Sequence, residues 1–186
     1  MQPVALRPSV SRLESVTDFR KAPMLHEGQP APQFSLPDAD MEMFDSASLL
    51  GKQHVVLFFY PKDDTPYCTL EAIDFSDHES EFNRHGCAVV GISRDDCLVH
   101  ADFRDKHGLS IRLLSDADAE VCHQYGVMHY REHEGHKKLV LTRSTFVIDK
   151  QGIIRHIVSD VKPKGHAAEI FQLVKQLGNK RNSHSQ

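Results

Sequence analysis

The sequence predicts an α/β sandwich with a mixed central sheet. Apolar runs of strand length alternate with segments of helical spacing, and a β-hairpin followed by an amphipathic helix ends the pattern. The 186 residues correspond to about one domain at roughly 150 residues per domain. No internal repeat or low-complexity tract divides the chain.

The strongest predicted elements come first along the chain. Residues 54–60 are continuously apolar, which is typical of a strand buried on both faces. Residues 66–83 carry apolar side chains at helical spacing, and residues 88–92 form a second buried-strand run. Residues 96–107 predict a helix that Gly108 ends.

The remaining predicted elements are shorter or weaker. A hairpin is expected where two apolar segments flank the turn Asp-Lys-Gln-Gly. In chain order, the shorter or weaker predicted elements are weak strands at 33–36 and 42–44, a strand at 111–114, a helix at 117–125, the hairpin strands at 139–148 and 153–158, and a helix at 166–177.

The composition excludes several classes of protein. No run approaches the roughly 18 apolar residues of a membrane helix. With a net charge of −4 and no dense basic patch, neither a membrane nor a nucleic acid is an expected partner. Four cysteines without a CxxC pair are too few for a disulfide scaffold.

The two ends of the chain carry no recognisable motif. Residues 1–24 lack the uninterrupted apolar region of a secretory signal, so we expect a thiol-reducing, cytoplasmic location. We expect this segment to be an extension, poorly ordered or peripheral, and residues 179–186 to be a C-terminal tail. Residues 25–178 would then form the folded domain.

The junction between the first buried strand and the helix after it is the candidate site. Pro66 suits the first helical position, which makes Thr65 the N-cap and places Cys68 in the first turn. Free N–H groups and the helix dipole favour an anion there, and a thiolate is the reactive form of cysteine. The alternative is that Cys68 is a small buried apolar residue on the helix.

This site and two later segments resemble the peroxiredoxins, specifically the bacterioferritin comigratory protein (peroxiredoxin Q) branch. The matching segments are FYPKDDTPYCTLEAIDF, GCAVVGISRDD and LTRSTFVIDKQGIIR. The family pattern Pro-x-x-x-Thr-x-x-Cys falls on Pro61, Thr65 and Cys68, and the resemblance covers roughly residues 25–178.

The resemblance implies a thioredoxin-like three-layer αβα sandwich that acts as a thiol-dependent peroxidase. Such a protein reduces hydrogen peroxide and organic hydroperoxides through a cysteine sulfenic acid, in antioxidant defence. Thioredoxin or a similar dithiol donor would recycle it. The resemblance requires no metal, haem or other cofactor, and we expect a monomer or a weak dimer.

The resemblance also implies a role for each residue of the site. Cys68 would be the peroxidatic cysteine, Thr65 would present its hydroxyl to thiolate and peroxide, and Pro61 would cover the site. Arg143 would stabilise the thiolate and the charge that develops on the peroxide, together with the backbone N–H groups of Tyr67 and Cys68.

Each of these roles has a structural alternative. Thr65 can serve only as a helix cap, and Pro61 can simply end a strand. Arg143 can be a surface arginine with a salt-bridge partner. Glu71, one turn after the cysteine, either orients an arginine or is a solvated helix residue.

The cysteine that resolves the sulfenic acid is less clearly marked. Many members of the branch carry it five residues after the peroxidatic cysteine, where this chain has Ile73. If the two buried strands are parallel, Cys97 begins a helix at the same sheet edge as Cys68, which makes it the candidate resolver. Cys87 and Cys122 are predicted to be packing residues. The alternative is a one-cysteine cycle with an external thiol.

Two further function classes remain. One is a thioredoxin-fold disulfide oxidoreductase or thiol-dependent chaperone, disfavoured because Thr65 stands where a CxxC has its first cysteine. The other is a zinc- or copper-binding module, whose ligands would be His123, His129, His133, His136 and Cys122. We instead interpret this histidine-rich segment, residues 123–136, as a solvated polar loop.

Overall fold

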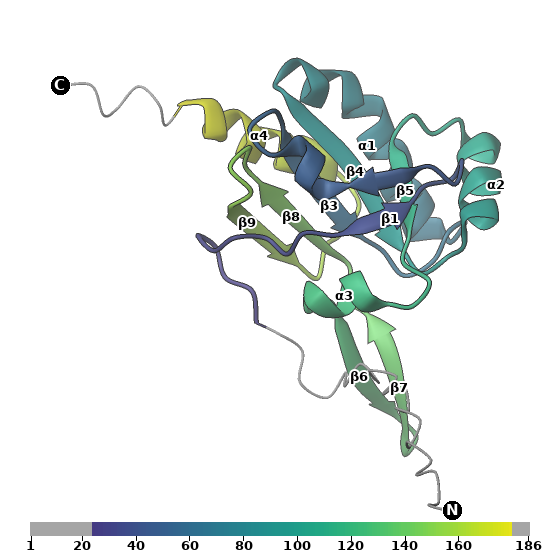
Figure 1. Cartoon of the computed structure of the whole chain (residues 1–186). Helices are drawn as coiled ribbons and strands as arrows, with labels where there is room; N and C mark the ends of the chain where they lie inside the picture. The colour runs from purple at the N-terminus through teal and green to yellow at the C-terminus, as the bar shows by residue number, and fades with distance from the viewer. Residues whose placement is uncertain (1–23, 180–186) are drawn as a thin grey trace, which may run out of the picture.

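The computed structural model describes residues 24–179, and Figure 1 shows how their helices and strands are arranged. In chain order the elements are β1 (Ser35–Pro37), β2 (Met43–Asp45), the 3-10 helix η1 (Ser46–Leu49), β3 (His54–Phe59), α1 (Pro66–Arg84), β4 (Cys87–Ser93), α2 (Cys97–His107), β5 (Arg112–Ser115), α3 (Glu120–Gln124), β6 (Met128–His133), β7 (His136–Leu141), β8 (Ser144–Ile148), β9 (Ile154–Ser159) and α4 (His166–Asn179). No helix within 24–179 is long and apolar enough to cross a membrane. The predicted extension and tail fall outside the described residues, apart from Met24 and Asn179.

The central sheet has five strands in the order β5-β4-β3-β8-β9. β3 runs parallel to β4, and β4 runs parallel to β5. β8 is antiparallel to both of its neighbours, β3 and β9. The mixed sheet predicted from the sequence is therefore present, and all six residues of β3 are buried, as its continuous apolar run indicates.

Each face of the sheet is covered by its own set of elements. Phe58 of β3 points to the face covered by α1, α2 and α4, where it stacks on Phe75 with ring centroids 4.6 Å apart. Its neighbour Phe59 points to the other face and packs 5.2 Å from Tyr125, at the end of α3. The predicted arrangement of helices on both faces of a sheet is thus confirmed.

Parallel pairing brings the starts of α1 and α2 to the same sheet edge, because each helix follows one of two neighbouring parallel strands. α1 has Pro66 in its first turn, after Thr65 in an extended conformation. α2 follows Asp96, whose carboxylate accepts a hydrogen bond from the N–H of Val99 at 2.9 Å. Gly108 ends α2 with a left-handed φ of 63°.

The single strand predicted over residues 139–148 is wrong. β7 ends at Leu141 and pairs with β6, whereas β8 begins at Ser144 and pairs with β3 and β9. An apolar run does not show where the chain changes its pairing partner. The predicted turn at residues 149–152 is present and joins β8 to β9, and the Asp149 carboxylate accepts from the N–H of Gln151 at 2.9 Å.

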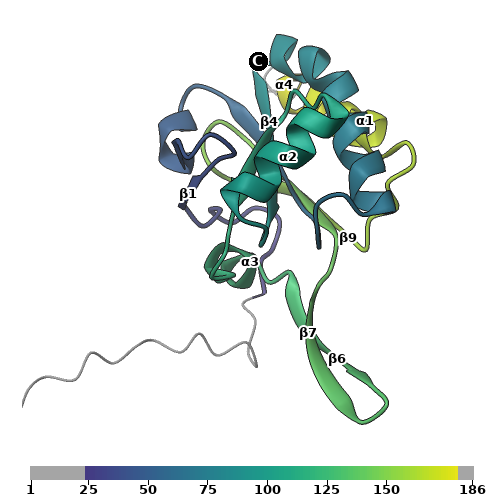
Figure 2. The same ribbon diagram turned by 90° about the vertical axis from the view of Figure 1, so that its right-hand side faces the viewer.

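The predicted polar loop at residues 123–136 is also wrong. Most of it belongs to the β6–β7 hairpin, which projects from the body as a two-stranded arm (Figure 2). Glu134 and Gly135 form the turn with φ values of 50° and 78°, as a type I′ turn requires. The exposed, mostly charged side chains of the arm lack the apolar alternation by which a half-buried strand is recognised.

Candidate active site

Cys68 lies in the first turn of α1, at the carboxyl edge of β3. Thr65 is extended, and the first helical hydrogen bond is donated by Thr69 to the Thr65 carbonyl at 2.9 Å. The N–H groups of Tyr67 and Cys68 therefore precede the helical ladder. These donors and the helix dipole favour negative charge on the Cys68 sulfur, whose residue is only 1% exposed.

Arg143 lies between β7 and β8 and places its guanidinium against this sulfur. Its Nη2 donates a hydrogen bond to Cys68 Sγ at 3.0 Å. Burial acts to lower the pKa of Arg143, but the charge of Glu71 and the contact with Cys68 outweigh it, so the pKa is raised. A fixed cation at this distance stabilises the thiolate form of the cysteine. Arg143 is therefore a half-buried partner of the site rather than a surface arginine.

Glu71 binds the other terminal nitrogen of the same guanidinium. Arg143 Nη1 donates to Glu71 Oε2, and the carboxylate is fully buried. Its second oxygen, Oε1, has no hydrogen-bond partner within residues 24–179. Burial raises the pKa of Glu71 to about 7, although Arg143 acts in the opposite direction. Of the two sequence interpretations of Glu71, the structure supports the one in which it orients an arginine.

Thr65 and Pro61 lie in the loop between β3 and α1. Thr65 stands at the N-cap position, but its hydroxyl does not cap the helix and instead donates to the Lys62 carbonyl at 2.8 Å. The capping alternative is thus wrong for the side chain, whose oxygen keeps its capacity to accept a hydrogen bond. Pro61 is exposed, and its role as a cover of the site stays a prediction.

Cys97 is the first residue of α2 and is half-buried. The loop before α2 touches the loop before α1, because the N–H of Asp63 donates to Asp95 Oδ2 at 2.8 Å. The structure therefore places Cys97 at the sheet edge that carries Cys68, and both are free thiols. Its function as a resolving residue stays a prediction.

The other two cysteines are packing residues, as the sequence predicts. Cys87 and Cys122 are fully buried in the two apolar clusters. Burial raises the pKa of Cys87 to about 12, and burial and the charge of Asp116 raise the pKa of Cys122 well above its usual value. Both therefore stay protonated and unreactive at neutral pH.

A buried polar group that was not predicted from the sequence lies beside the site. The side chains of Asp63 and His100 are hydrogen-bonded, with 2.5 Å between Oδ2 and Nδ1, and the Tyr60 hydroxyl donates to the other oxygen of Asp63 at 2.6 Å. The available signal was the position of His100, three residues before the buried Phe103 on α2. A histidine on an apolar helix face suggests a buried partner but does not identify it.

The histidine-rich segment gives no support to a metal-binding module. No three His, Cys, Asp or Glu side chains are grouped as a metal site within the described part of the chain. On the β6–β7 arm, His133 and His136 are directly paired, and His129 lies further along the same strand face. These three residues are exposed.

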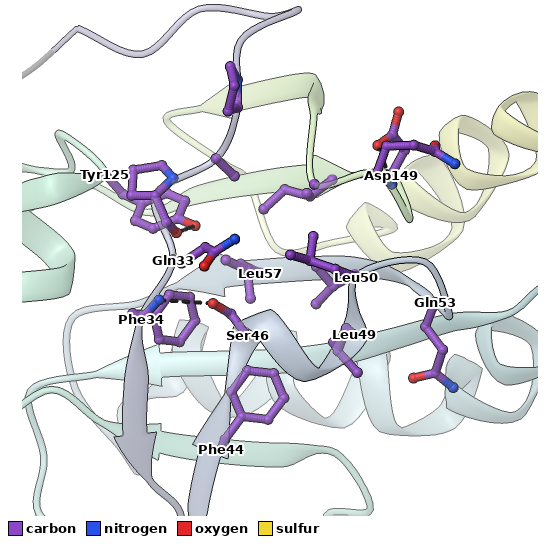
Figure 3. Close-up of a pocket in the computed structure, with 17 residues that line it drawn as sticks. Gln33, Phe34, Phe44, Ser46, Leu49, Leu50, Gln53, Leu57, Tyr125 and Asp149 are labelled. Atoms are coloured by element: carbon purple, nitrogen blue, oxygen red, sulfur yellow. Dashed lines mark hydrogen bonds between the residues drawn. The ribbon is translucent and has the colours of Figure 1, made fainter.

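Figure 3 shows a separate apolar pocket. The residues of the central sheet that line it belong to the face opposite α1. Its volume is about 110 Å³, and its lining includes Phe34, Phe44, Leu57 and Tyr125. The hydrogen bond from the Phe34 N–H to Ser46 Oγ, 2.9 Å long, fixes one wall. None of the residues of the candidate active site lines this pocket.

Curated relatives align with most of this chain. The chain is 46% identical to a Bcp-type peroxiredoxin of Coxiella burnetii over 143 residues, which are 77% of this chain and 94% of the relative. It is 37% identical to peroxiredoxin Bcp of Escherichia coli, over 82% of this chain and 97% of that protein.

Solved structures of the same group match the fold. The bacterioferritin comigratory protein of Xanthomonas campestris, studied as a trapped intermediate and ligand complex for its alkyl peroxide reduction activity, superposes with a TM-score of 0.75 at 30% identity, covering 77% of this chain and 90% of that one. Peroxidoxin BcpB of Mycobacterium tuberculosis superposes with a TM-score of 0.73 at 34% identity, covering 82% and 98%.

A family model supports the same assignment. The model described as the AhpC/TSA family matches residues 27–157, which include the thiol, the arginine and the glutamate of the site. The fold is accordingly thioredoxin-like. The chain therefore belongs to the AhpC/TSA family and, within it, to the Bcp (peroxiredoxin Q) branch of thiol-dependent peroxidases.

Proposed function

We propose that Cys68 is the peroxidatic cysteine of a peroxidase acting on hydrogen peroxide and alkyl hydroperoxides. The observation that carries this proposal is the 3.0 Å hydrogen bond from Arg143 Nη2 to Cys68 Sγ in a buried site. A thiolate is the nucleophile in this chemistry, and the guanidinium and the helix start both stabilise it. The alkyl peroxide activity of the Xanthomonas relative supports the same substrate class.

In the proposed reaction the Cys68 thiolate attacks one peroxide oxygen. An S–O bond forms, the O–O bond breaks, and the other oxygen leaves as water or an alcohol after taking up a proton. Arg143 and the N–H groups of Tyr67 and Cys68 stabilise the charge on the leaving oxygen. Thr65 positions the peroxide through its hydroxyl, and Pro61 limits the access of water.

Cys97 is the proposed resolving cysteine. Its position at the start of α2, on the edge shared with α1, supports this assignment. Thioredoxin or a similar dithiol would reduce the resulting disulfide, in the thiol-reducing cytoplasm, as part of antioxidant defence. The peroxidase domain spans residues 25–178 in this proposal, between the predicted extension and tail.

Replacement of single cysteines tests both assignments. The experiment compares purified wild type with Cys68→Ser, Cys97→Ser and the control Cys87→Ser. Each protein is treated with one equivalent of peroxide and alkylated under denaturing conditions, and its intact mass is then measured by mass spectrometry. We expect Cys68→Ser to consume no peroxide and Cys97→Ser to retain a sulfenic acid, whereas wild type and Cys87→Ser form an internal disulfide. Full activity of Cys68→Ser would refute the central assignment, and a sulfenic acid that persists in wild type would refute the role of Cys97.

A further inference from the structure

A buried hydrogen bond between two side chains connects the loop before Cys68 to the helix that begins with Cys97. The side chains of Asp63 and His100 are 1% and 0% exposed, with 2.5 Å between Oδ2 and Nδ1. The proposed reaction uses neither residue. Burying two such groups is costly unless their polar atoms are satisfied, so their surroundings indicate what the pair does.

Every side-chain polar atom of the pair has a partner. His100 Nε2 lies 2.9 Å from the Leu114 carbonyl oxygen, and since a carbonyl only accepts, this nitrogen carries a proton. Asp63 Oδ1 accepts from the Tyr60 hydroxyl at 2.6 Å. With both ring nitrogens bonded, His100 has none left to act as a base or a ligand. The pair therefore serves to hold the loop against α2.

The position of the pair bears on how the two cysteines come together. Asp63 shortly precedes Cys68, and His100 lies one helical turn after Cys97. A disulfide needs Cα atoms within about 4.4–6.8 Å, which two intact helix starts seldom allow. Cys68 is also buried in the closed site. We therefore expect the chain after Asp63 to leave its folded position before the disulfide forms.

We propose that the Asp63–His100 hydrogen bond is the positioning contact that keeps this site closed and reactive toward peroxide, and that it thereby limits the rate of disulfide formation. The inference rests on the proposed function. In the controlled step, the Cys97 sulfur bonds to the Cys68 sulfur, the S–O bond of the sulfenic acid breaks, and the hydroxyl leaves as water with the Cys97 proton. A site held closed for longer also exposes the sulfenic acid to a second peroxide, which oxidises it to sulfinic acid.

Asp64, the next residue in the loop, offers a matched control. It bonds Lys106 at 2.6 Å and His107 at 2.8 Å, and so joins the same loop to the last turn of the same helix. These contacts are solvent-exposed, and exposed pairs contribute little to stability. Its φ of 57° is one that asparagine tolerates, so Asp64→Asn removes the charge without backbone strain.

Two substitutions of His100 separate its two hydrogen bonds. An asparagine amide reaches the place of Nδ1, so His100→Asn keeps a donor for Asp63. A glutamine amide reaches the place of Nε2, so His100→Gln keeps the bond to Leu114 and leaves Asp63 without it. Tyr60→Phe, which removes only the hydroxyl that bonds Asp63, weakens the same contact more gently and serves if His100→Gln does not fold.

The measurement is the rate of disulfide formation after one equivalent of peroxide, together with the sulfinic fraction at excess peroxide. We expect His100→Gln to form the disulfide about tenfold faster than wild type and to accumulate less sulfinic acid, because a buried hydrogen bond between the loop and α2 is lost. Tyr60→Phe should form the disulfide about threefold faster than wild type, a smaller acceleration than that of His100→Gln. The rate of disulfide formation should stay within about twofold of wild type in His100→Asn, which keeps the donor to Asp63. The same holds for Asp64→Asn, which removes only exposed contacts.

Several outcomes would overturn the inference. One is an unchanged disulfide rate in folded His100→Gln, or in Tyr60→Phe where His100→Gln does not fold. Another is a parallel slowing of the peroxide and disulfide steps, which indicates general damage to the structure. Cys97→Ser separates the two proposals. If wild type itself forms no disulfide, the role of Cys97 fails and the inference fails with it. If Cys97→Ser loses the disulfide, as the proposed function requires, but the His100 and Tyr60 variants form it at the wild-type rate, the inference alone fails.

Discussion

The guanidinium of Arg143 donates from both of its terminal nitrogens, Nη2 to the Cys68 sulfur and Nη1 to the Glu71 carboxylate. A planar fork can serve two acceptors at fixed angles, whereas a lysine ammonium is a single point charge on a flexible stem. The directional contact with the sulfur therefore depends on arginine itself and not only on a positive charge.

This geometry predicts the effect of Arg143→Lys. We expect the rate constant for the reaction of Cys68 with peroxide to fall by about 10²–10³, the usual cost of removing one preorganised donor from a reacting centre. Stopped-flow measurement of the first turnover checks this. Arg155→Lys is the control, because Arg155 is exposed and pairs with Asp149 on the neighbouring hairpin. A loss of less than tenfold for Arg143→Lys would contradict the prediction.

The residues of the site differ in how far the sequence alone could identify them. The Thr65–Pro66 start of α1 places Cys68 in a first turn by local rules, and the structure has that turn. The contact between Arg143 and Cys68 joins residues far apart in the chain, and only the family resemblance pointed to it. The Asp63–His100 contact is equally non-local and belonged to no recognised motif, so it was missed.

Among the elements, the packing of α1 against the sheet depends on a glycine in β4. An added Cβ at Gly91 would lie 2.7 Å from Phe58 Cζ and 3.1 Å from Leu113 Cδ2. Phe58 has no free space, because it is fully buried and stacks on Phe75. The ring of Phe58 thus occupies the place of the missing side chain.

Gly91→Ala should therefore destabilise the protein by about 1–3 kcal/mol, the usual cost of overpacking a core. Gly178→Ala is the matched control, because nothing lies within 4 Å of an added Cβ there and the residue is in α4. Alanine in a helix is favoured over glycine, so this variant should be unchanged or stabilised by less than about 1 kcal/mol. Urea unfolding measures both. Equal stability of the two variants would show that β4 or Phe58 shifts easily.

Element prediction succeeded where a segment has a strong local pattern. The buried run of β3 and the long helix α1 were located to within a residue or two, because burial on both faces and helical spacing are visible in the sequence. The β6–β7 arm has neither signal, since cross-strand backbone pairing holds it and most of its side chains are solvent-exposed. Backbone pairing leaves no trace in composition.

For the whole molecule, two buried groups make opposite contributions to the dependence of stability on pH. Burial raises the pKa of Glu71 to about 7, so its contribution to stability is present below pH 4.5 and is lost as the pH rises through 7. Burial lowers the pKa of His166 to about 4, so its contribution is present above pH 6.5 and is lost as the pH falls through 4. Between pH 4.5 and 6.5 the two contributions offset each other.

Glu71→Gln should remove the contribution of Glu71 to the pH dependence of stability and leave that of His166. Relative to wild type, the free energy of unfolding of the variant should rise by about 3 kcal/mol between pH 4.5 and 7, because the variant no longer buries an ionising carboxylate. His166→Gln should show the opposite slope relative to wild type. Urea unfolding at several pH values measures both differences. Parallel stability curves for wild type and Glu71→Gln would show that Glu71 ionises alike in the folded and unfolded states.

The arm formed by β6 and β7 is continuous with the strand that leads to the active site. β7 passes through Thr142 directly into Arg143, and the N–H of Thr142 bonds the Val127 carbonyl at 2.8 Å, which fastens the base of the arm. A displacement of the arm would therefore be passed along the backbone to the residue that carries the guanidinium. A fluorescent reporter on the turn at Glu134 and Gly135, which joins β6 to β7, would test whether the arm changes its surroundings when Cys68 is oxidised.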